Sequence, residues 1–74
     1  MMLDREDMEG QVQRTIEAIH DFMKDKCYET ALHADYQLSM LRLVIGSSFD
    51  SLHWFVAAER EVSRVVDSYS KPKD

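Results

Sequence analysis

The stretch from Tyr28 to Ile45 most constrains the fold, because as a helix it would be apolar on two opposite sides. Steps of three and four residues bring side chains onto one face of a helix. One such face carries Ala31, Ala34, Leu38, Leu41 and Ile45. The roughly opposite face carries Tyr28, Leu32, Tyr36, Met40 and Leu43. A helix that only covers the core of a monomer needs one apolar stripe, so two stripes indicate burial on two sides.

We assign the first face to the core of the chain and predict that the second is a protein interface. Tyrosine and methionine, which the second face contains, are enriched at protein interfaces. The alternative is that the other helices of the chain sandwich this one and cover both faces within a monomer. Each helix of a three-helix bundle contacts its two neighbours over adjacent faces rather than opposite ones, which favours an external partner.

The rest of the chain also predicts helices. Only two glycines and one proline occur in 74 residues, which is typical of an all-α protein. Residues 12–24 carry an apolar stripe that continues in phase into the 28–45 helix. Two architectures follow, a small three-helix bundle or a helical hairpin with a long first helix. We favour a break around Asp25 to Cys27, where Asp25 can cap the next helix. The stripe consists of Val12, Ile16, Ile19 and Met23, and it is widened by Met8, Thr15 and Phe22.

Gly46 marks a firmer boundary. It follows the last apolar residue of the 28–45 helix and suits the left-handed position after a helix C-terminus. Ser47 is expected to cap the next helix, which predicts a tight Gly46-Ser47-Ser48 turn between antiparallel helices. We expect that last helix over residues 49–69. Its predicted core stripe is Leu52, Phe55, Val62, Val66 and Tyr69.

The chain divides into three parts on these boundaries. We expect an acidic N-terminal segment at residues 1–10, either frayed or forming the first turns of the first helix, a single helical domain at 11–69 and a polar C-terminal tail at 70–74.

Few side chains suggest chemistry. Glu59 falls inside the stripe of the last helix, where a carboxylate is costly to bury unless it is paired. Arg42, on the preceding helix, is its candidate partner, so we predict a structural polar pair. The histidines, His20, His33 and His53, fall one on each helix without the spacing of a metal motif. We predict no catalytic residue, no metal site and no cofactor, and therefore no enzyme.

Composition bears on the partners. Fourteen acidic residues against nine Lys and Arg give a net charge of −5, which opposes binding to nucleic acid and anionic membranes. No apolar run approaches the roughly 20 residues that span a bilayer, and no secretory signal is recognisable, so we expect a cytoplasmic protein.

A core this small is marginal, and a single cysteine excludes an internal disulfide. We therefore expect a homodimer or another protein partner to complete it.

These features together predict a small acidic protein–protein interaction module, such as an adaptor, inhibitor, anti-activator or secretion-type chaperone. The alternative is a DNA-associated transcriptional regulator, because the helices around Gly46-Ser47-Ser48 superficially resemble a helix-turn-helix. The helix after this turn, expected over residues 49–69, has no Arg or Lys before Arg60 to contact phosphate, which weakens that alternative.

Overall fold

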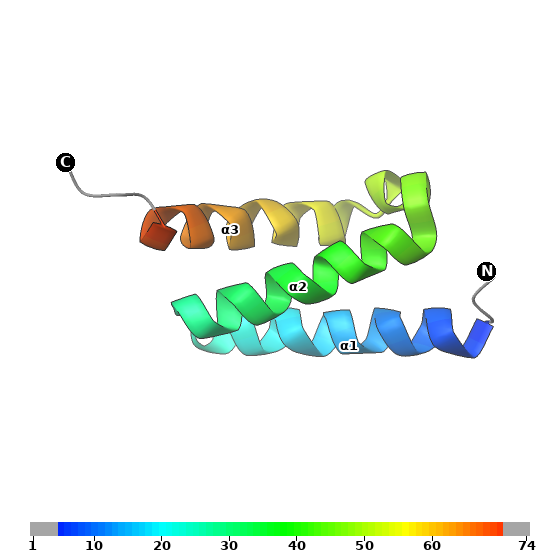
Figure 1. Cartoon of the computed structure of the whole chain (residues 1–74), viewed down its shortest axis with the longest axis horizontal. Coiled ribbons are helices and arrows are strands. Elements are labelled where there is room, and N and C mark those ends of the chain that lie inside the picture. Colours follow the sequence, from blue (N-terminus) through cyan, green and yellow to red (C-terminus); the bar gives the residue numbers. More distant parts are fainter. Residues whose placement is uncertain (1–4, 71–74) are drawn as a thin grey trace.

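The structure is a computed structural model that describes residues 5–70. Three α-helices and a short 3-10 helix follow one another as α1 (Arg5–Lys24), α2 (Tyr28–Ile45), η1 (Gly46–Ser51) and α3 (His53–Ser70). In Figure 1, α2 lies between α1 and α3 and is tilted to both, while α1 and α3 run in the same direction and α2 runs opposite. The predicted all-α class is confirmed, and of the two architectures the three-helix one is observed.

The connection between α1 and α2 is held by its own polar groups. Cys27 is the N-cap of α2 in an extended conformation, with φ −125° and ψ 174°. The Thr30 hydroxyl donates to the Asp25 carbonyl at 2.6 Å and accepts the Cys27 N–H at 3.2 Å. The predicted break around Asp25 to Cys27 is therefore confirmed. The predicted cap is wrong, because the Asp25 main chain takes part in the turn while Cys27 occupies the cap position.

The connection between α2 and α3 is longer than the three-residue turn that we expected. Gly46 has the expected positive φ of 60°, and its N–H donates to the Arg42 carbonyl. The chain then forms η1 through Ser51, and the Val56 N–H bonds to the Leu52 carbonyl at the start of α3. Phe49 of η1 is fully buried. Helix α3 therefore begins four residues later than expected, since burying Phe49 requires the intervening turn.

The caps and ends of α3 also differ from the expectation. Within residues 5–70 the Ser47 hydroxyl does not cap α3, and instead the Ser51 hydroxyl donates to the Ser48 carbonyl at 2.8 Å. Residues 5–10, expected as part of a separate acidic segment, form the first turns of α1. Residues 1–4 and 71–74 lie outside the described part of the chain.

The buried residues confirm the stripe predicted for α2. On α1 the buried face is rotated relative to the predicted stripe. On α2, Ala31, Ala34, Leu38 and Leu41 are all at most 1% exposed, and Ile45 packs against them. On α1, the predicted Met23 is 58% exposed, whereas Ala18 and Phe22 are buried. The remaining buried apolar side chains are Ile19, Phe49, Phe55 and Val62. The stripe of α3 is also shorter than predicted, because Leu52 and Tyr69 at its ends are exposed.

A buried polar network explains the rotation of α1. The Gln11 side-chain amide donates to the Gln37 carbonyl at 3.1 Å and to the Gln37 side-chain oxygen at 3.0 Å. The Thr15 hydroxyl lies 3.2 Å from the same carbonyl and is fully buried. Polar groups without partners are costly to bury, so this network favours the α1 face that carries Gln11 and Thr15. Met23 turns outward as a result, while Ile19 stays buried.

Candidate protein-binding surface

The five side chains predicted as an interface lie together on α2, on the side away from its buried stripe. We call Tyr28, Leu32, Tyr36, Met40 and Leu43 the outer face. Met40 is half-buried, and the exposed fractions of the other four are 38% for Tyr28, 41% for Leu32, 61% for Tyr36 and 79% for Leu43. Both α1 and α3 pack against α2 and still leave much of the outer face exposed.

Tyr28 differs from the rest of the outer face. Its ring lies 5.3 Å from the ring of Tyr69 near the end of α3, centroid to centroid. We expected Tyr28 to have no partner within the chain, and this contact corrects that expectation. Tyr69 is itself 61% exposed, so it extends the outer face onto α3. The sequence offered no signal for this, because Tyr69 follows the apolar spacing of α3.

The charges around the outer face are predominantly acidic. Glu29 and Asp35 belong to α2, and no described residue forms an ion pair with either. The one Lys or Arg of α2 is Arg42, and both its ion-pair partners are carboxylates within the chain. The helix therefore presents apolar side chains flanked by carboxylates that form no ion pair with any described residue.

Arg42 and Glu59 lie together, in the arrangement that the sequence suggested. The Arg42 guanidinium bonds to Glu59 at 2.7 Å and to Asp50 at 3.5 Å, and it stacks over the Phe49 ring at 4.4 Å. The Arg42 and Glu59 side chains are 44% and 28% exposed. An exposed pair of this kind ties α2, η1 and α3 together but contributes only modest stability.

A second apolar opening lies between α1 and α3, and sequence reasoning missed it. We call it the α1/α3 groove, a cavity of about 240 Å³. At its edges His20 and Trp54 make an edge-to-face contact at 6.1 Å, and Lys26 lies 3.9 Å from Glu61. The exposed apolar Met23 was the signal, but its helical phase matched a core position. The lining residues are Ile19, Met23, Lys26, Trp54, Ala57, Ala58 and Glu61.

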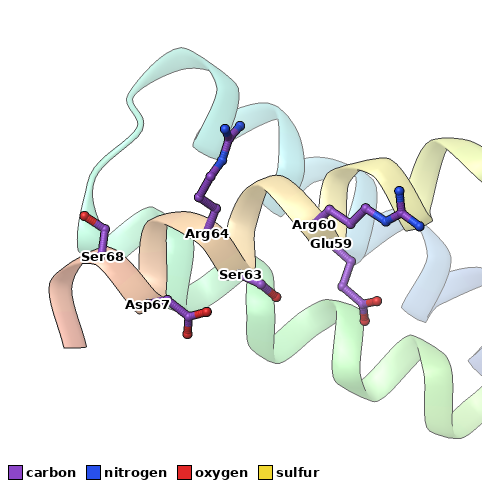
Figure 2. A pocket seen from close by; sticks show the side chains of 6 residues that line it. All are labelled: Glu59, Arg60, Ser63, Arg64, Asp67 and Ser68. Carbon is purple, nitrogen blue, oxygen red and sulfur yellow. The ribbon is translucent and has the colours of Figure 1, made fainter. Parts of the chain in front are cut away.

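A depression lined by polar side chains runs along α3. Its volume is about 660 Å³. Figure 2 shows that its side chains diverge, with Glu59 directed toward α2 and Arg64 directed away from it. Arg64 bonds to Glu61 and Glu59 bonds to Arg42, so both charges already have partners. This shallow surface does not gather groups around a common point. It is lined by Glu59, Arg60, Ser63, Arg64, Asp67 and Ser68.

The three histidines lie on the surface, one on α1, one on α2 and one on α3. His20, His33 and His53 are all exposed, and His20 contacts Trp54. Within residues 5–70, no group of three or more His, Cys, Asp or Glu side chains is arranged to hold a metal ion. None of the helices in that range combines the length and hydropathy that crossing a bilayer demands.

Comparison with known proteins adds no relative. No protein-family model matches the chain, and neither the curated proteins nor the solved structures include a significant match.

Proposed function

We propose that this protein acts by binding another protein through the outer face of α2, without catalysing a reaction. The observation that carries the proposal is the difference in side-chain exposure between the two sides of α2. Leu38 on the core side is 1% exposed, whereas Leu43 on the outer face is 79% exposed. Large apolar side chains gathered in this way on a small protein mark an interaction site.

The composition of the outer face supports the same proposal. Two tyrosines and a methionine lie among leucines on one rigid helix, and Tyr69 extends the patch. Tyrosine buries a large area and keeps a polar group for hydrogen bonding, and methionine adapts its shape to a partner. Roles that work by binding alone, such as an adaptor, inhibitor, anti-activator or secretion-type chaperone, need only such a surface.

The alternative role in DNA binding has less support. The exposed start of α3 presents His53, Trp54 and Ala57, and no Lys or Arg precedes Arg60 in that helix. Binding to DNA depends on Lys and Arg that neutralise phosphates. A lone cysteine fits reducing conditions, so we propose that the protein acts in the cytoplasm.

Affinity capture with matched variants tests the proposal. Leu43→Glu charges the outer face, and Met23→Glu places the same charge at an exposed position on α1. Proteins bound specifically through the outer face are retained by the wild type and Met23→Glu and are lost with Leu43→Glu, as quantified by mass spectrometry. Capture that Leu43→Glu leaves intact would contradict the proposal. Circular dichroism establishes that both variants keep the helical content of the wild type.

A further inference from the structure

We propose that the occupant of the outer face is a second copy of this chain, with the two α2 helices antiparallel about a twofold axis near Tyr36. The inference rests on the proposed function and names the partner of the same surface. Three observations support it: the area of the face, the order of its side chains along α2, and the placement of the charges around it.

The exposed area matches what a dimer needs. With roughly 200 Å² for a fully exposed large side chain, the outer face and Tyr69 present on the order of 500 Å². A standard interface buries about 800 Å² on each partner, of which about 60% is apolar. The apolar part of such an interface is therefore about as large as the surface that α2 and Tyr69 leave exposed.

The order of the side chains is nearly symmetric about Tyr36. Leu32 and Met40 each lie four residues from it, and Tyr28 and Leu43 lie at the two ends of the face. An antiparallel pairing about Tyr36 places Leu32 of one copy opposite Met40 of the other. It also places Tyr28 opposite Leu43 and brings the two Tyr36 rings together. Every large side chain of the face then meets another, as a self-complementary interface requires.

The charges on α2 favour the antiparallel pairing over a parallel one. A parallel pair would bring Glu29 and Asp35 each close to its own copy, and like charges facing each other are unfavourable. In the antiparallel pair, the two Glu29 side chains lie at opposite ends of the interface, and only Asp35 remains close to its equivalent. Antiparallel helices also align their dipoles favourably.

The net charge gives the dimer a distinctive response to salt. Two chains of charge −5 repel each other, and salt screens that repulsion over a Debye length that falls from about 10 Å at 0.1 M to about 3 Å at 1 M. Self-association through apolar side chains therefore strengthens as salt is added. Binding of a basic protein to the same acidic surroundings would weaken.

Sedimentation velocity over a dilution series tests the inference. We expect the wild-type chain to dimerise in roughly the micromolar range, more tightly at high salt. Tyr36→Glu should weaken dimerisation by roughly thirtyfold or more, and the control Met23→Glu should leave it unchanged. A wild-type chain that stays monomeric throughout the series overturns this inference. The capture experiment then decides the proposed function separately. Assembly lost in Met23→Glu but kept in Tyr36→Glu also overturns the inference, because the α1/α3 groove would then be the interface.

Disulfide trapping tests the geometry. In a Cys27→Ser background, Tyr36→Cys places a thiol near the twofold axis and Leu43→Cys places one far from it. We expect the Tyr36→Cys chain to form covalent dimers several times faster under mild oxidation, as resolved on non-reducing gels. Equal rates, or a faster reaction of Leu43→Cys, would contradict the antiparallel arrangement.

Discussion

The two sides of α2 are built from similar side chains but have opposite surroundings. On the core side, small and medium residues are buried against α1, η1 and α3, and Ala31 and Ala34 allow close packing. On the outer face, larger residues stand in solvent, with Leu43 79% exposed. The difference shows that hydrophobicity alone does not assign a helix face to the core. Ala31 and Ala34 distinguish the core side, because such small residues permit the close approach of neighbouring helices.

The largest effect that we predict comes from truncating a leucine on the core side of α2, compared with a leucine on its outer face. Leu38→Ala removes fully buried atoms and leaves a cavity, so it should lower the free energy of unfolding by about 2–5 kcal/mol. Leu43→Ala is the matched control on the outer face and should cost less than about 0.5 kcal/mol in the monomer. Urea denaturation at protein concentrations below dimerisation measures both. Equal losses of unfolding free energy from the two variants would contradict the assignment of one side of α2 to the core and the other to solvent.

The polar network between α1 and α2 should show the next largest effect. Gln11→Ala removes the amide that donates to the Gln37 carbonyl and to the Gln37 side-chain oxygen, and among side chains only the Thr15 hydroxyl then still donates to that carbonyl. We expect a loss of about 1–3 kcal/mol in the free energy of unfolding, measured by thermal denaturation. Gln13→Ala, on the exposed side of the same helix, is the control and should have little effect. An unchanged Gln11→Ala melting temperature would show that the network does not fix the face of α1.

Gly46 should be sensitive for a backbone reason. A Cβ at this position meets no atom within 4 Å, so a substitution acts only through the positive φ of 60°. Gly46→Ala should therefore destabilise the chain by about 1–2 kcal/mol. Gly10→Ala lies within α1, where alanine favours the helix, and should stabilise it by about 0.5–1 kcal/mol. Differential scanning calorimetry should show the two melting temperatures moving in opposite directions, and shifts of the same sign would refute this explanation.

The ion pair between Arg42 and Glu59 should have the smallest effect. Glu59→Gln keeps the side-chain shape and removes the charge, and an exposed pair is worth about 0.2–1 kcal/mol. The loss should shrink when salt is added, because salt screens exposed charges. Chemical denaturation at low and high salt measures this dependence. A loss of several kcal/mol would mean that the pair holds α2 and α3 together far more strongly than its exposure suggests.

Much of the fold follows from the sequence because its local signals agree. Gly46 ends α2, the break at residues 25–27 separates two helices of ordinary length, and the small-residue stripe of α2 is buried. These features depend on residues close together in the chain. The candidate surface was also predictable, since helical spacing alone separates the outer face from the core stripe.

The remaining features depend on contacts between distant residues. The phase of α1 follows from Gln11 and Thr15 bonding to Gln37, which hydrophobic spacing does not predict. The 3-10 turn follows from the burial of Phe49 against the end of the bundle. The α1/α3 groove follows from the phase of α1, because the rotation turns Met23 outward and leaves it in the groove with Trp54.

The most direct test of self-association through the outer face is a dilution series of amide NMR spectra of the isotopically labelled chain. We predict that the resonances which shift with concentration belong to the outer face of α2 and to Tyr69, and that Leu38 and its core neighbours stay unchanged. Resonances that shift around Met23 and Trp54 instead, or spectra identical at every concentration, would contradict the assignment of this face to self-association.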